Sequence, residues 1–233
     1  MPLRAKVFFW LTVLLGIFTV AFYFPRSEFS RFNFVIIGFL VAFAFFAEIY
    51  EIEILPRHSV SVSTAIYMSF VYIGDAALAV SASFAAIFAS ETLMRGVDFQ
   101  EEGSIIFPLH KVGFNTSQVV LSVAASSLVF NAVGGHSPPF TVSFDYLPPF
   151  LAFLTFIVIN ISLVSGMVSL AEGESFLYQM RFSLRNLHLQ VFSLGVLSVL
   201  IAVIFASSPW NLFLVAVLLL LVNMSLRSYI NIR

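Results

Sequence analysis

Five polar residues recur at helical spacing within an apolar segment, and they are the strongest candidates for chemistry in this sequence. Lys111, Asn115, Gln118, Ser122 and Ser126 are separated by 4, 3, 4 and 4 residues. Residues three or four apart lie on one face of a helix, so we call these five residues the polar stripe. Polar side chains within a membrane need partners or water. The stripe therefore predicts hydrogen bonds between helices, or else the wall of a ligand cavity or permeation path.

The next apolar segment contributes a partial polar counterpart. Its hydroxyl residues are Thr155, Ser162, Ser165 and Ser169, and Asn160 lies on another face. If the protein binds a ligand, we expect the pocket between segments 75–94, 105–133 and 147–170. Asn115 is the leading binding residue, because its amide offers two donors and an acceptor. Rows of Ala and Ser in segment 75–94 favour close helix packing.

Carboxylates form the second group of candidates. Glu48 and Glu91 lie deepest within apolar segments, whereas Glu51, Glu53 and Asp75 lie nearer to predicted interfaces. A carboxylate inside a membrane is costly and suggests a function by default. The alternative is that these groups cap helices or pair with basic residues at the inner surface, namely Arg57, Arg95 or Lys111. A proton relay, a cation site and a ligand contact all remain open.

No signature of catalysis is found in the sequence. The histidines, His58, His110, His136 and His188, lack the spacing of metal ligands. Phosphate loops, dinucleotide fingerprints and nucleophile motifs are absent, and without Cys there are no disulfides or thiolate ligands. We therefore expect no enzyme, no catalytic residue and no metal site. The sequence identifies no cofactor, although haem ligation by paired histidines remains open.

Composition indicates that a lipid bilayer surrounds the elements that position these residues. Of the 233 residues 60% are hydrophobic and only 10% are charged, and the mean hydropathy is +1.02. A soluble domain typically has about 25% charged residues. The chain shows no basic patch that would indicate nucleic acid as a partner. It is thus an integral membrane protein whose first partner is the bilayer.

Eight segments are apolar enough to be considered as membrane-spanning helices, which need about 20 such residues. They are 7–24, 34–49 (continuing to about 53), 59–73, 75–94, 105–133, 147–170, 187–206 and 210–227. The sequence predicts an all-α transmembrane bundle of about eight helices in one domain, residues 1–233. Six or seven spans remain open if segment 59–73 is re-entrant. Gly74-Asp75 predicts a tight turn at the outer surface, with Asp75 as the helix N-cap.

The distribution of basic residues predicts the orientation of the bundle. With eight spans and the N-terminus inside, nine of the eleven Lys and Arg residues lie on the inner side. This asymmetry fits the positive-inside rule and places both termini in the cytoplasm. In the inner segment 171–186, Phe176, Met180 and Leu184 alternate with Arg181 and Arg185, a pattern that suits the membrane surface.

Short motifs along most of the chain carry a resemblance to a known family. They are Ala47-Glu48, Leu55-Pro56-Arg57, Val60-Ser61-Val62-Ser63, Gly74, Lys111, Phe114-Asn115, Asn160, Ala171-Glu172-Gly173 and Ser225-Leu226-Arg227-Ser228-Tyr229. In this order and spacing the chain resembles the multi-helix N-terminal membrane sensor regions of bacterial HD-GYP and GGDEF proteins, which act in cyclic-di-GMP signalling. The resemblance implies signal reception in the inner membrane, and a cytoplasmic output domain as a partner.

The leading functional hypothesis is therefore a non-catalytic membrane sensor or ligand-binding module. Its candidate ligand-binding residues are Asn115, Gln118, Ser122, Lys111, Asn160, Glu48 and Glu91. A small permease, or the substrate-binding subunit of a transporter, is the second hypothesis. An accessory subunit packed against a larger membrane complex is the third. The sequence names neither the signal nor the oligomeric state.

Overall fold

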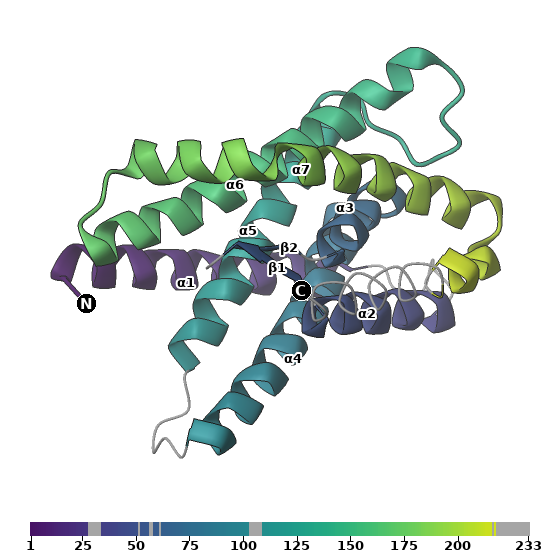
Figure 1. Ribbon diagram of the computed structural model, residues 1–233. Coiled ribbons are helices and arrows are strands. Elements are labelled where there is room, and N and C mark those ends of the chain that lie inside the picture. The colour runs from purple at the N-terminus through teal and green to yellow at the C-terminus, as the bar shows by residue number, and fades with distance from the viewer. Residues whose placement is uncertain are drawn as a thin grey trace, which may run out of the picture.

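The computed structural model describes residues 1–27, 34–50, 52–55, 58–60, 62–102, 109–215 and 217, most of which are helical (Figure 1). In chain order the elements are α1 (Leu3–Tyr23), η1 (Phe24–Arg26), α2 (Phe34–Ile49), β1 (Ile52–Leu55), β2 (His58–Val60), α3 (Ser63–Ile73), α4 (Ala76–Glu102), α5 (Leu109–Ala132), η3 (Ser143–Tyr146), α6 (Leu147–Glu172), α7 (Phe176–Ser207) and η4 (Pro209–Asn211). The predicted helical architecture is thus confirmed for the described residues.

Four stretches of the described chain are long and apolar enough to cross a membrane. They are Leu3–Arg26, Ala76–Val97, Leu109–Ala132 and Phe144–Glu172. Three shorter apolar helices, Phe34–Ile49, Ser63–Ile73 and Phe192–Ser207, accompany them. These helices fit a transmembrane bundle. Most of the expected last span, from residue 218 to 227, lies outside the described residues.

The short helix α3 lies at the centre of the fold. Every side chain from Ala65 to Ile73 is buried, and α2, α4, α5 and α7 pack around it. A helix that is apolar on all sides is stable only when it is surrounded. Its 11 residues extend about 16 Å, roughly half of the ~30 Å hydrocarbon layer. Within the expected span 59–73 the helix is therefore shorter than a full membrane-spanning helix, and the number of spans stays a prediction.

The turn between α3 and α4 follows the sequence prediction. Helix α3 ends at Ile73, and α4 begins at Ala76. The carboxylate of Asp75 accepts a hydrogen bond from the backbone N–H of Leu78, with an N–O distance of 2.7 Å. This contact is the expected N-cap interaction, in which a side-chain oxygen satisfies a backbone donor that the first helical turn leaves free.

A short antiparallel hairpin between α2 and α3 was not expected from the sequence. Strand β1 pairs with β2 in the register Ile52↔Val60 and Glu53↔Ser59. The second helix was expected to continue to about Glu53, but α2 ends at Ile49. The run Ile-Glu-Ile-Leu alternates apolar and polar residues at its start, a pattern typical of a strand. Because the segment is mostly apolar, the sequence analysis did not detect the change from helical to strand periodicity.

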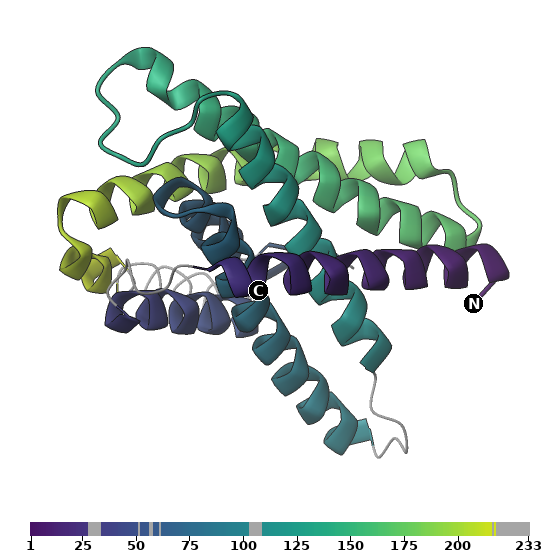
Figure 2. The same cartoon turned by 180° about the vertical axis from the view of Figure 1, so that it is seen from behind.

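Helix α5 connects most of the bundle. It packs against α4, α6, α1 and α3, and Figures 1 and 2 show α4 and α5 running obliquely across α1, α6 and α7. The contact with α1 is close at one glycine. A Cβ atom added at Gly16 would lie 2.5 Å from Cβ of Ser117. Only glycine allows α1 and α5 to approach to this distance.

The seventh helix begins earlier than the sequence analysis placed it. Helix α6 ends at Glu172 and is followed by Gly173, which has a left-handed backbone conformation with φ of 77°. Helix α7 starts at Phe176 instead of residue 187. The amphipathic segment with Arg181 and Arg185 is continuous with the apolar helix that follows. Within segment 176–186 no Gly or Pro interrupts the helix.

Candidate functional site

Two of the predicted site residues meet between α4 and α5. The amide nitrogen of Asn115 donates a hydrogen bond to Oε1 of Glu91 at 2.8 Å. The other carboxylate oxygen of Glu91 lies 3.4 Å from Nε of Arg95, one turn along α4. Glu91 is 6% exposed and Asn115 is half-buried. The polar stripe therefore contributes one direct contact between helices, and that contact holds a buried carboxylate.

The second buried carboxylate has different partners. Oε1 of Glu48, at the end of α2, accepts hydrogen bonds from the hydroxyls of Ser63 at 2.6 Å and Tyr67 at 2.9 Å. Both donors belong to α3, at positions i and i+4. Glu48 is 8% exposed and Tyr67 is 1% exposed. The sequence analysis proposed basic partners for Glu48 and missed these two hydroxyls.

The two buried carboxylates each hold a different pair of helices. Glu48 bonds α2 to α3, and Glu91 bonds α4 to α5. We call Glu48, Ser63, Tyr67, Glu91, Arg95 and Asn115 the carboxylate network. It lies inside a core that is otherwise mostly apolar. Because buried charges need hydrogen-bonding partners, a change in one carboxylate alters how the two helices that it bonds are held together.

The network lies well below the turn between α3 and α4. Along the helix axes, Ser63 is about 15 Å from Ile73, and Glu91 is about 23 Å from Ala76. Ser137, in the loop between α5 and α6, donates a hydrogen bond to the carbonyl oxygen of Ile73 at 3.1 Å. This bond places that loop beside the α3–α4 turn. The network therefore lies toward the opposite ends of these helices.

The remaining residues of the polar stripe do not join the network through any hydrogen bond seen here. The hydroxyl of Ser122 donates to the carbonyl oxygen of Gln118, and Ser126 donates to that of Ser122, both at 2.7 Å. Oε1 of Gln118 is buried without a partner among the described residues, and Lys111 is exposed. The two serines thus satisfy their hydroxyls within α5, as expected of residues at a packed interface.

Asn160 lies half-buried on α6 and is not brought into contact with the network by any interaction seen here. Two other polar residues of this helix bond locally. Thr155 donates to the carbonyl oxygen of Leu151, and Ser169 donates to that of Glu174. The pocket expected between α4, α5 and α6 stays a prediction.

An open groove of about 450 Å³ lies on a different side of α5, between α1, α4 and α5. Apolar residues such as Val13, Ile17 and Phe88 form most of its wall, and Thr116 and Ser117 add hydroxyl groups. None of the seven predicted site residues lines it. This groove has the size of a small-molecule site but contains no charged side chain.

A second polar cluster lies in the loop between α5 and α6. Asp145 accepts hydrogen bonds from the backbone N–H groups of Thr141 at 2.6 Å and Val142 at 2.9 Å, and its other oxygen lies 3.4 Å from Nε2 of His136. The backbone bonds from Val142 and Thr141, and then His136, lower the pKa of Asp145. The carbonyl of Ser137, and then Asp145, raise the pKa of His136 above its usual 6.5.

Comparisons of the chain with protein-family models, with curated proteins and with solved structures found no match. Among the described residues, no group of three or more His, Asp or Glu side chains is placed to hold a metal ion. The candidate site is therefore defined by its own chemistry. It consists of two buried carboxylates, each bonded by side chains from a neighbouring helix.

Proposed function

We propose that the chain is a non-catalytic sensor or ligand-binding module of a bacterial inner membrane, and that the carboxylate network is its receiving site. The observation that carries this proposal is the contact between Glu91 of α4 and Asn115 of α5. Carboxylates buried within membrane proteins are rare and usually functional. A proton or cation that binds Glu91 competes with Asn115 and Arg95 for the same oxygens.

If the contact between Glu91 and Asn115 breaks, α5 would transmit the structural change to the rest of the bundle. Helix α6 packs against α5, and α7 packs against both α6 and α3. A shift of α5 against α4 would therefore change the packing around α7. Packed helices respond to local changes by moving between discrete arrangements. The resemblance to cyclic-di-GMP sensor regions supports a cytoplasmic output domain as the recipient of such a change.

Distance measurements between α4 and α5 test this proposal. The chain has no Cys, so spin labels can be introduced at single cysteines without removing native ones. Leu93 on α4 and Leu109 on α5 are exposed and suit this purpose. In lipid nanodiscs, we expect acidification to change the Leu93–Leu109 distance distribution in the otherwise unaltered chain. The same labels combined with Glu91→Gln should give a distribution that no longer responds to pH. A wild-type distribution that ignores both pH and added cations would contradict a receiving role for Glu91.

Transport is the second candidate function, because two buried carboxylates in one helix bundle also suit a proton relay. Proteoliposomes that contain a pH-sensitive dye distinguish the two functions. A sensor should not conduct protons when a pH gradient and a membrane potential are imposed. Proton flux that disappears in Glu91→Gln would overturn the sensor proposal and support a proton-coupled permease.

The proposed orientation has both termini inside. The bond from Ser137 to Ile73 supports placing the turn at Gly74 and the loop at Gly135 on one side of the membrane. Reporter fusions at Gly74 and Gly135 should both report the outer side, and a fusion at Arg233 the inner side. A result in which Gly74 and Gly135 report opposite sides would contradict this topology.

A further inference from the structure

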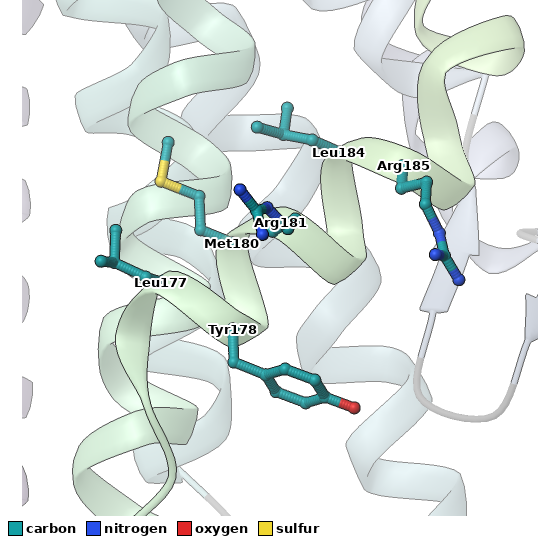
Figure 3. A pocket seen from close by; sticks show the side chains of 6 residues that line it. All are labelled: Leu177, Tyr178, Met180, Arg181, Leu184 and Arg185. Atoms are coloured by element: carbon teal, nitrogen blue, oxygen red, sulfur yellow. The ribbon is translucent and has the colours of Figure 1, made fainter.

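The first three turns of α7 present an unusual exposed surface. Leu177 is 73% exposed and Tyr178 is 62% exposed, and Arg181 and Arg185 are exposed beside them. Together with Met180 and Leu184 these residues line an open groove of about 860 Å³. Figure 3 shows Leu177, Met180 and Leu184 projecting to one side of the helix and Tyr178 and Arg185 to the other, with Arg181 between them.

An apolar row on the same helix continues this surface. Phe192, Val196 and Leu200 are exposed at intervals of four residues, so they lie on one face of α7. Arg185 precedes Phe192 by seven residues, or about two turns, and Arg181 precedes Arg185 by four. The two arginines therefore stand at the end of this apolar face. The face from Phe192 to Leu200 extends about 12 Å, close to the thickness of one leaflet of the bilayer.

We propose that this face of α7 binds an anionic phospholipid of the inner leaflet. The phosphate lies at Arg181 and Arg185, and an acyl chain follows Phe192, Val196 and Leu200. Guanidinium groups suit phosphate because they offer several donors in a fixed plane, and basic side chains next to apolar helices attract anionic lipid. Exposed Tyr178 fits the interfacial level, where aromatic rings with a polar end are enriched.

The charges that line the groove favour an anion. Glu172 and Glu174 precede the groove along the chain, and neither of them lines it. The groove itself is lined by two arginines and by no acidic residue. The alternative occupants are a second copy of this chain and a soluble phosphate compound. Each of them predicts a different result in the experiment that follows.

Native mass spectrometry of the full chain, titrated with phosphatidylglycerol or phosphatidylcholine, tests the proposal. One basic residue contributes about fivefold to binding at an anionic surface, so Arg181→Gln/Arg185→Gln should weaken phosphatidylglycerol binding roughly 30-fold. Arg181→Lys/Arg185→Lys should retain much of the binding. The matched control is Arg4→Gln/Lys6→Gln, which removes the same charge from the expected inner end of α1 and should bind normally. Thermal unfolding of each variant verifies that the fold is intact.

Three results would overturn the proposal. The first is equal phosphatidylglycerol binding by the folded Arg181→Gln/Arg185→Gln variant and the wild type, or an equal loss in the α1 control. The second is displacement of the bound lipid by excess inorganic phosphate, which would indicate a site for soluble anions. The third is a dimer in the wild type that the same double substitution abolishes, because a second copy would then be the occupant of the groove.

Discussion

Replacing Asn115 by leucine removes the one side chain of α5 seen to bond the buried carboxylate of Glu91. In the native protein the amide of Asn115 donates to Oε1 of Glu91 at 2.8 Å. Leucine has a similar size but cannot donate, so one oxygen of a carboxylate that is 6% exposed loses its donor. The fold should survive, because α5 also packs against α1, α3 and α6.

The expected magnitude follows from the charge and burial of Glu91. Hydrogen bonds to charged groups contribute about 1.5–3 kcal/mol in soluble proteins. Polar contacts between helices in a membrane average about 0.6 kcal/mol and reach about 1.7 kcal/mol. Because Glu91 retains Arg95 at 3.4 Å, we expect Asn115→Leu to lower the free energy of unfolding by about 1–2 kcal/mol.

A double-mutant cycle separates this bond from other effects of the leucine. Unfolding in bicelles by titration with a denaturing detergent measures Asn115→Leu, Glu91→Leu and the double variant. If the bond stabilises the fold, the double variant loses about 1 kcal/mol less than the sum of the single losses. Asn131→Leu, at an exposed position on α5, is the matched control and should change stability little. Additive losses in the cycle, or an equal loss in the control, would refute the reasoning.

Three further predictions concern packing, capping and pH. Gly16→Ala should destabilise the fold by about 1–3 kcal/mol, because its Cβ would collide with α5, whereas Gly38→Ala, with no atom within 4 Å, should be neutral; thermal unfolding measures both. Asp75→Leu should lower the free energy of unfolding by about 1 kcal/mol through loss of the N-cap, measured by detergent titration. Because the fold raises the pKa of His136, the protonated His136 side chain stabilises loop 134–146 below pH 6.5. That stabilisation is lost as pH rises through the folded pKa. Amide hydrogen exchange in the loop, corrected for intrinsic rates, measures this effect. Exchange should become faster at higher pH in the wild type, and this change should be absent in His136→Gln.

Local features of the fold were predictable because they depend on neighbouring residues. The turn at Gly74 was predictable because Gly is common in turns, and the cap by Asp75 because a side-chain oxygen lies three residues before its donor. In the structure Gly74 has an extended backbone with φ of −112°, and a Cβ atom there would lie 2.7 Å from the side chain of Leu78. The long apolar helices follow from length and hydropathy. Strand β1, Ile52–Leu55, was missed because four residues that are mostly apolar fit a strand and the end of a helix equally well.

The carboxylate network was predictable only in part. Burial of Glu48 and Glu91 was expected from their positions in apolar segments, and Arg95 was among the expected partners of these carboxylates because it lies one turn from Glu91. Ser63 and Tyr67 were not found, because their contact with Glu48 depends on how α2 and α3 are aligned. Spacing within one helix gives the face on which a residue lies, but it does not give the register against a neighbouring helix.

The polar stripe illustrates the same distinction between face and partner. Its spacing predicted one polar face on α5. Its two serines bond the α5 backbone, whereas Asn115 bonds a side chain on α4. A serine hydroxyl is short and can satisfy itself one turn back along its own helix. An asparagine amide reaches farther, so among these residues it is the better group to connect helices. A polar stripe in a membrane helix is therefore best searched for function at its amides and carboxylates, and Asn115 with Glu91 is the pair on which the sensor proposal stands.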